Sequence, residues 1–147
     1  MNTVILGAAG AGKTTLAARL GLPDRFHGAE PLAELVYHAR GADLALIVFD
    51  VSIPAQVQAS RAEIVVRQAG IERVLAVANK MDLAGYEYEA FKAARTVFLR
   101  GWSLTPPLFV PVSARFGDFV HAPGNRIDWH YGAALASHLG LEAEVAA

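Results

Sequence analysis

Residues Gly7–Thr14 read Gly-Ala-Ala-Gly-Ala-Gly-Lys-Thr, and this stretch decides the fold. It fits the pattern G-x-x-x-x-G-K-S/T, in which the backbone N–H groups of a glycine-rich loop surround phosphate groups. The apolar run Val4-Ile5-Leu6 precedes the loop, and a helical pattern over Lys13–Leu20 follows it. Strand, loop and helix in this order favour a phosphate site over a Gly/Ala-rich turn that binds nothing.

Each residue type in the loop has a distinct expected task. Gly7 allows a sharp turn after the strand, and Gly12 lets the backbone approach an anion closely. The Lys13 ammonium is expected at the β- and γ-phosphates, and the Thr14 hydroxyl at Mg²⁺. The positive end of the following helix supports the same anion.

A second motif, Asn79-Lys80-Met81-Asp82, fits the N-K-x-D pattern of guanine-nucleotide binders and directly follows an apolar run. A carboxylate at Asp82 accepts two parallel hydrogen bonds from guanine N1–H and N2–H₂, whereas adenine would leave it unpaired. Asn79 would tie loops together, and the Lys80 stem would cover one face of the ring. Ser113 and Ala114 follow the next apolar run, and the Ala114 N–H is expected at guanine O6. Alone, the motif could be a surface turn that caps a helix.

The whole chain alternates short apolar runs with helical patterns. Continuous apolar runs indicate parallel strands that helices cover on both faces, so we expect a three-layer α/β fold of the phosphate-loop NTPase type with a mostly parallel sheet. The expected strands are 4–6, 44–49, 74–78 and 108–112. The expected helices are 13–20, 32–39, one starting at Pro54, one spanning Phe91 to Trp102, and 131–139.

Composition sets broader limits. The 147 residues, 54% hydrophobic with net charge −1, suit one domain over 1–141 with a frayed tail at 142–147. No basic field suggests nucleic acid or an anionic membrane as partner, and no run is long enough to span a bilayer. The chain has no cysteine, which excludes disulfides and is compatible with the cytoplasmic location that we expect.

The motifs resemble those of the translation-factor class of GTPases, and most closely the GTPase subunit of ATP sulfurylase (sulfate adenylyltransferase subunit 1). The similar stretches are 41–50, 77–83 and 109–114, and Gly117-Asp118 followed by Trp129 and Tyr131 is similar to the end of that family's G domain. The resemblance implies a G-domain fold, GTP or GDP with Mg²⁺ as cofactors, and a tie to sulfate activation.

The chain departs from that family between its two motifs. A βαβ unit takes about 30 residues, so the interval from Lys13 to Asn79 leaves little room for the two edge strands and the switch loops of a full G domain. The nearest relic of the family's switch is residues 24–28. Loss of both strands would leave 4–6 as a sheet edge, which residues 22–30 of the same chain, a homodimer or another protein partner would cover.

We therefore expect a guanine-nucleotide-binding protein with Mg²⁺ whose GTP hydrolysis is weak or depends on a partner. The alternatives are a non-enzymatic interaction module on the same scaffold and a small phosphotransferase, which the Asn79–Asp82 motif disfavours. Catalysis would rest on Lys13 and, in place of a switch residue, on His27, which could equally be an ordinary loop histidine. Metal binding would rest on Thr14 and, through water, on Asp50. The expected nucleotide ligands are Gly7, Gly10, Ala11, Gly12, Lys13, Thr14, Thr15, Asn79, Lys80, Asp82, Ser113 and Ala114.

Overall fold

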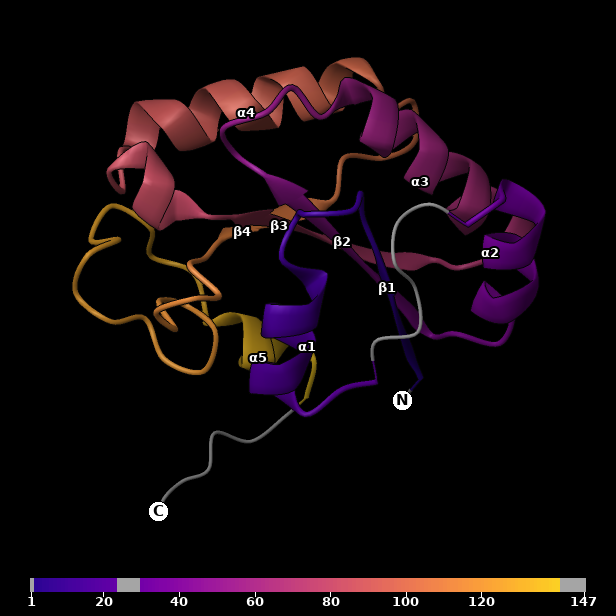
Figure 1. The fold of residues 1–147 in the computed structure, drawn as a ribbon, viewed down its shortest axis with the longest axis horizontal. Coiled ribbons are helices and arrows are strands. Elements are labelled where there is room, and N and C mark those ends of the chain that lie inside the picture. The colour runs from indigo at the N-terminus through magenta and orange to yellow at the C-terminus, as the bar shows by residue number, and fades with distance from the viewer. Residues whose placement is uncertain (1, 24–29, 141–147) are drawn as a thin grey trace.

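A computed structural model describes residues 2–23 and 30–140 of the chain. Figure 1 shows the path from the N-terminal strand to the C-terminal helix. The elements in chain order are β1 (Thr3–Leu6), α1 (Lys13–Leu20), α2 (Leu32–Ala39), β2 (Leu44–Asp50), α3 (Gln56–Ala69), β3 (Arg73–Asn79), the 3₁₀ helix η1 (Met81–Ala84), α4 (Tyr88–Arg100), β4 (Leu108–Pro111) and α5 (Leu135–His138).

The four strands form one parallel sheet in the order β1-β2-β3-β4. Helices α2, α3 and α4 pack in sequence along one face, and α1 and α5 lie on the other (Figure 1). The expected three-layer α/β fold is confirmed. The strand order makes β1 an edge strand, as the short interval between the motifs predicts. The described residues between α1 and α2 contain no strand.

The core follows from the continuous apolar strands. Six of the seven residues of β2 are buried, because helices cover the sheet on both faces. An aromatic cluster of Phe49, Phe98 and Phe109 joins β2, α4 and β4, with ring centroids 5.0–6.2 Å apart. Gly101 allows α4 to end against the start of α3, since a Cβ there would lie 2.0 Å from the Gln56 carbonyl oxygen.

Most predicted elements agree with the structure to within two or three residues, and the last helix does not. The prediction of a helix over 131–139 is wrong, because α5 spans only Leu135–His138 and Tyr131 is 94% exposed. Three boundaries also differ. Pro54 lies two residues before α3, Trp102 follows the end of α4, and Val112 follows β4. The predicted tail at 142–147 lies outside the described residues.

In the described part of the chain, none of the helices has the length and apolar character needed to cross a membrane.

Candidate functional site

The predicted motifs meet at one end of the sheet, where the parallel strands terminate. The Gly7–Thr14 phosphate loop follows β1, Asp50 ends β2, Asn79–Asp82 ends β3 and leads into η1, and Ser113-Ala114 follows β4. Because the strands are parallel and adjacent, all of these segments lie at their carboxyl ends, where open α/β sheets bind ligands. The structure thus brings the two ligand motifs together.

Two glycines of the phosphate loop are required by close contacts. A Cβ at Gly7 would lie 2.4 Å from the Val48 carbonyl oxygen, so the loop could not leave β1 beside β2 with any larger residue. A Cβ at Gly12 would lie 2.2 Å from Asn79 Nδ2. Gly12 therefore makes room for a protein side chain, which is a different reason from the anion contact expected from sequence. Lys13 is buried at the start of α1.

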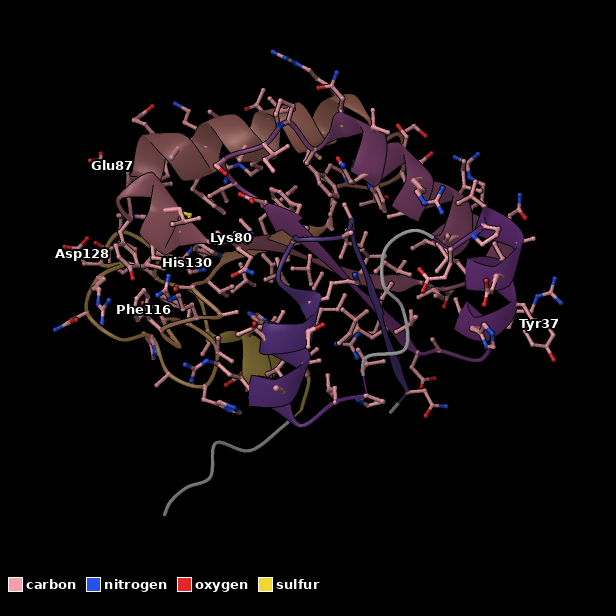
Figure 2. The ribbon with its side chains drawn as sticks, in the orientation of Figure 1. Tyr37, Lys80, Glu87, Phe116, Asp128 and His130 are labelled. Carbon is pink, nitrogen blue, oxygen red and sulfur yellow. The ribbon has the colours of Figure 1, made fainter. Side chains whose placement is uncertain are left out.

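Two side chains of the Asn79–Asp82 motif reach the phosphate loop. The buried Asn79 amide donates from Nδ2 to the Ala11 carbonyl at 2.8 Å. Lys80 Nζ donates to the Gly10 carbonyl at 2.6 Å, and Figure 2 shows this lysine near the middle of the molecule. Lys80 has a left-handed backbone with φ 68°, which turns the chain from β3 into η1. Asn79 and Lys80 thus fix the loop that would hold phosphate.

Asp50 is engaged by protein groups on both carboxylate oxygens. Oδ1 accepts hydrogen bonds from the Ser52 N–H at 2.8 Å and its hydroxyl at 2.6 Å, and Oδ2 lies 3.4 Å from Lys80 Nζ. Partial burial pushes the pKa of Asp50 upward, but the hydrogen bonds from Ser52 and the charge of Lys80 outweigh it, so the pKa is lowered. The carboxylate is therefore ionised at neutral pH and orients Lys80.

The base loop, residues 113–117, positions the carboxylate of the second motif. The Ser113 hydroxyl, which is fully buried, donates to Asp82 Oδ1 at 2.8 Å. This hydrogen bond orients the Asp82 carboxylate. The carboxylate can still accept hydrogen bonds from a ligand, because each of its oxygens accepts more than one. The Ala114 N–H donates to Asn79 Oδ1 at 2.9 Å. This N–H, expected at guanine O6, thus already has an acceptor in the protein.

Arg19 is a site residue that the sequence motifs do not reveal. From the last turn of α1, its Nε donates to the Ala114 carbonyl and its Nη2 donates to the Arg115 carbonyl at 2.6 Å. The contact joins residues about 95 positions apart in sequence, and no local pattern marks it. It connects the helix that starts at the phosphate loop directly to the base loop.

The remaining predicted residues have less structural definition. Thr14 and Thr15 lie in the exposed first turn of α1. His27 and the rest of residues 24–28 lie outside the described residues. No group of three or more His, Asp or Glu side chains suited to a metal ion occurs in residues 2–23 and 30–140. A metal at this site would depend on ligand oxygens together with Thr14, which fits the way Mg²⁺ is usually held through phosphates.

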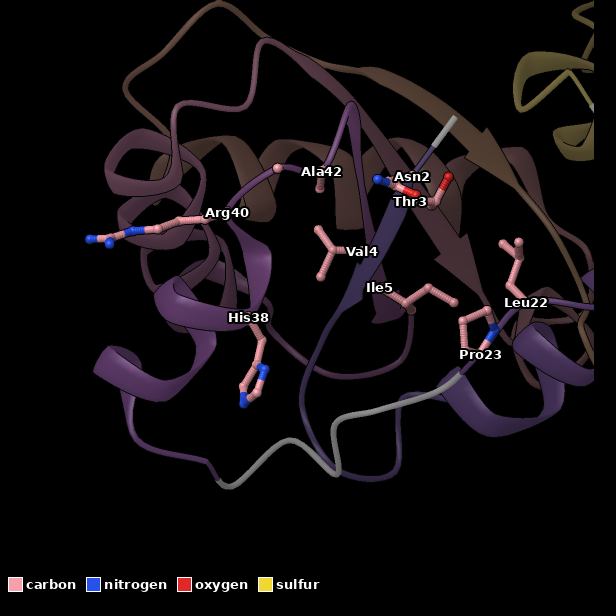
Figure 3. Close-up of a pocket in the computed structure, with 10 residues that line it drawn as sticks. Asn2, Thr3, Val4, Ile5, Leu22, Pro23, His38, Arg40 and Ala42 are labelled. Carbon is pink, nitrogen blue, oxygen red and sulfur yellow. The ribbon is translucent and has the colours of Figure 1, made fainter.

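The larger cavities lie away from these motifs. A groove of about 260 Å³ runs along β1 (Figure 3), and a recess of about 420 Å³ lies at the amino ends of β2 and β3. The cavity that the phosphate loop lines has only about 40 Å³. A small-molecule pocket usually has several hundred Å³, so this cavity is too small to enclose a nucleotide. A nucleotide would instead lie across the carboxyl ends of the strands. Chemistry, rather than volume, therefore identifies this site.

A parallel sheet with a phosphate loop after its first strand and N-K-x-D after its third defines a G domain of the phosphate-loop NTPase class. Known proteins agree. Sulfate adenylyltransferase subunit 1 of Laribacter hongkongensis is 34% identical over 100 residues, which cover 66% of this chain and 21% of the relative. Elongation factor 1-alpha of Archaeoglobus fulgidus is 33% identical over 115 residues, covering 75% of this chain and 27% of the relative. No family model matches the sequence.

Solved structures show the same fold. The structure of sup35 complexed with GDP has a TM-score of 0.71 at 22% identity, covering 94% of this chain and 43% of that one. A GTP-binding protein from Sulfolobus solfataricus in complex with GDP has a TM-score of 0.61 at 19% identity, covering 94% and 53%. The chain belongs to the translation-factor class of G domains and is close to sulfate adenylyltransferase subunit 1. It spans about a quarter of the length of these curated relatives.

Proposed function

We propose that the chain binds GTP and GDP together with Mg²⁺. The observation that carries this proposal is that Asp82 and Lys13 both lie at the carboxyl ends of the parallel strands. Ser113 orients Asp82, and Asn79 fixes the phosphate loop. Asp82 would accept from guanine N1–H and N2–H₂, and Lys13 would neutralise phosphate charge. Relatives that were solved with GDP support the choice of ligand.

The phosphate loop would hold the α- and β-phosphates through its backbone N–H groups, with Thr14 as the protein's own ligand for Mg²⁺. When bound, the ion would supply charge neutralisation at the β- and γ-phosphates. Asp50 is ionised and lies beside the loop, where it can accept from a water of the metal's hydration shell. Lys80 shares this carboxylate, so Asp50 would act through water rather than as a direct ligand.

Titration with GTP, ATP and XTP in the presence of Mg²⁺ tests the proposal. We expect guanine to be preferred over adenine by roughly 10⁴-fold, because adenine does not offer Asp82 the pair of donors that guanine N1–H and N2–H₂ provide. The variant Asp82→Asn should shift the preference toward xanthine, whose 2-oxo group accepts from an amide. Unchanged GTP affinity in this variant would remove the base-site assignment. A preference for ATP would instead support the phosphotransferase alternative, and failure to bind any nucleotide the interaction module.

Hydrolysis of GTP should be weak, or should need a partner. Catalysis of this reaction requires a water that is oriented for attack and groups that stabilise charge in the transition state. Lys13 is available for the second task. For the first task the sequence offers His27, which lies outside the described residues. A role of His27 in orienting water stays a prediction. A place in sulfate activation rests on the relatives' name alone.

We infer that the partner at the β1 edge of the sheet is a second copy of the chain. In the β1–β2 ladder the Leu44 N–H donates to the Asn2 carbonyl, and Thr3 pairs in register with Leu44. Alternation along a strand then directs the N–H and C=O groups of Thr3 and Ile5 to the open side. No hydrogen bond to these four groups occurs within the described ranges. A sheet edge whose backbone N–H and C=O groups lack partners is a template for pairing with another strand.

A two-fold axis through Val4 would complete both edges at once. In an antiparallel pair, Thr3 of one copy would exchange two hydrogen bonds with Ile5 of the other, and Ile5 would do the same with Thr3. All the outward groups of both copies would then be paired in one eight-stranded sheet. A groove of about 260 Å³, lined in part by Leu22, Pro23 and His38, lies beside β1 (Figure 3). Tyr37, 70% exposed and directed outward on α2 (Figure 2), would gain a neighbour.

A further inference from the structure

We propose that Arg19 is a positioning residue for the base loop, and that it directs the Arg115 N–H toward the oxygen at position 6 of the purine. The inference rests on the proposed function, since it concerns how the same site reads a guanine nucleotide. It moves the 6-oxygen contact from Ala114, where the sequence pattern places it, to the next peptide.

The first step is a count of the donors in the base loop. Four backbone N–H groups follow Ser113, and three of them donate to protein acceptors. Ala114 donates to Asn79 Oδ1 at 2.9 Å, Phe116 to Ser113 Oγ at 3.3 Å, and Gly117 to the Ser113 carbonyl at 2.6 Å. Within the described residues, no hydrogen bond is made by the Arg115 N–H. It is the donor that the loop leaves for a ligand.

The second step is the orientation of that donor. The Ala114 carbonyl and the Arg115 N–H belong to one trans peptide and point in opposite directions. Arg19 Nε donates to this carbonyl, so the guanidinium fixes the carbonyl toward α1 and the N–H away from it. Arg19 Nη2 donates to the Arg115 carbonyl at 2.6 Å and fixes the next peptide as well. A planar guanidinium can make both hydrogen bonds at once, whereas the compact ammonium of a lysine at this position does not present the same pair of donors.

The third step is the rigidity of Arg19 itself. Its own carbonyl oxygen lies 2.6 Å from His121 Nε2, so the segment after the base loop holds α1 from the other side. A Cβ at Gly117 would lie 3.3 Å from Arg19 Nη1, and only a glycine leaves the guanidinium this space without pressure. Arg19 is therefore held by contacts at both ends of residues 114–121. A basic residue that only stabilises the last turn of a helix does not require such contacts.

The experiment compares the affinities of three nucleotides in variants of the full chain. GDP is the reference, 6-thioguanosine diphosphate carries a weaker acceptor at position 6, and inosine diphosphate lacks the 2-amino group that Asp82 would read. In the unmodified chain GDP should bind about three- to tenfold more tightly than the 6-thio analogue, the range for one neutral hydrogen bond. In Arg19→Leu this ratio should fall toward one, while the ratio of GDP to inosine diphosphate stays unchanged. Arg19→Lys should restore only part of the first ratio.

Arg67→Leu is the matched control, since Arg67 also ends a helix but pairs with Glu63 on α3. It should change neither ratio. A parallel fall of both ratios in Arg19→Leu and Arg19→Lys would show a general structural role and overturn the inference, as would a 6-thio ratio that neither variant changes. If Arg19→Leu does not fold, Arg19→Lys carries the test because it keeps the charge and the stem. Failure of the unmodified chain to bind GDP would instead refute the proposed function.

Discussion

The Asn79 side-chain oxygen accepts the Ala114 backbone N–H at 2.9 Å, while the Asn79 amide nitrogen donates to the phosphate loop at Ala11. One buried side chain thus joins the segments at the carboxyl ends of β1, β3 and β4. The two halves of a nucleotide site, one for the base and one for the phosphates, are held at a fixed separation by this amide. Neither half can move independently while both hydrogen bonds are intact.

Replacement of Asn79 by alanine should therefore damage stability and binding together. The Ala11 carbonyl and the Ala114 N–H would both lose their partner in a site where Asn79 is only 2% exposed. Each unsatisfied buried group costs about 1–3 kcal/mol, so we expect a loss of about 2–6 kcal/mol in the free energy of unfolding. Urea denaturation measures this loss, and calorimetry with GDP should show at least tenfold weaker binding. Lys92→Ala, on the exposed face of α4, is the control.

The strands were predictable because burial dictates their composition. β2 lies between two helical layers, and such a strand must be apolar at nearly every position, which is visible in Leu44–Phe49. The last helix was not predictable, because distant segments compete for its backbone. The Leu135 and Ala136 N–H groups donate to the Phe119 and Val120 carbonyls at 2.8 and 2.7 Å. Those bonds replace the intrahelical ones that a helix starting at Tyr131 would make.

The same distinction applies to the site. The placement of motif residues such as Asn79 and Ser113 at strand ends was predictable, since each motif directly follows an apolar run. Arg19 was not, because its two acceptors are backbone carbonyls, and any residue type supplies a carbonyl. The reason for Gly12 was also inaccessible from sequence, since the group that excludes a side chain there comes from β3.

Two glycines of the phosphate loop should separate steric from conformational effects. Gly12 and Gly10 both have positive φ, 97° and 84°, so alanine is strained at either position. Only at Gly12 would the new Cβ meet another group, Asn79 Nδ2 at 2.2 Å; at Gly10 it would meet nothing within 4 Å. Gly12→Ala should thus abolish measurable GDP binding, and Gly10→Ala should weaken it by about tenfold or less. Equal effects in calorimetry would contradict the assigned role of Asn79.

The stability of the chain should fall as the pH decreases below about 6.5. Burial, with a smaller repulsion from His138, lowers the pKa of His130 from its ordinary value of 6.5. Its folded pKa is below its unfolded value, so the unfolded state binds the proton more readily and stability rises with pH. The contribution is present above pH 6.5 and is lost as the pH falls through the folded pKa. Thermal melting of the unmodified chain and of His130→Gln at pH 7.5 and 5.5 tests this.

The variant should lose less of its melting temperature between the two pH values than the unmodified chain does. It removes a ring that packs against Phe119 with centroids 5.0 Å apart, so its melting temperature should be lower at both pH values. The protonation of His130 is measured by the difference between the two proteins in how steeply the melting temperature changes with pH, rather than by the melting temperatures themselves. Identical slopes would show that the pH dependence arises elsewhere.

The proposed dimer predicts opposite effects of proline at neighbouring positions of β1. The Thr3 N–H faces the open edge, so Thr3→Pro should remove a donor to the second copy and leave the β1–β2 ladder intact. The Val4 N–H faces β2, so Val4→Pro should destabilise the fold itself. Light scattering at high concentration should show a dimer for the unmodified chain and a folded monomer for Thr3→Pro. A monomer for the unmodified chain under the same conditions would rule out the edge as its interface.

Steady-state phosphate release at saturating GTP should be slow, at or below about 10⁻³ per second, the range of an intrinsic G-domain rate without a stimulating partner. Lys13 can still offset charge in the transition state, so Lys13→Ala should reduce even this rate, although it should also weaken nucleotide binding. His27→Ala tests whether that histidine orients the attacking water. An unchanged rate at saturating GTP would show that His27 is an ordinary loop residue, whereas a large fall in the rate would support its catalytic role. Turnover of several molecules per second in the purified chain would mean that a group other than Lys13 and His27 positions the attacking water.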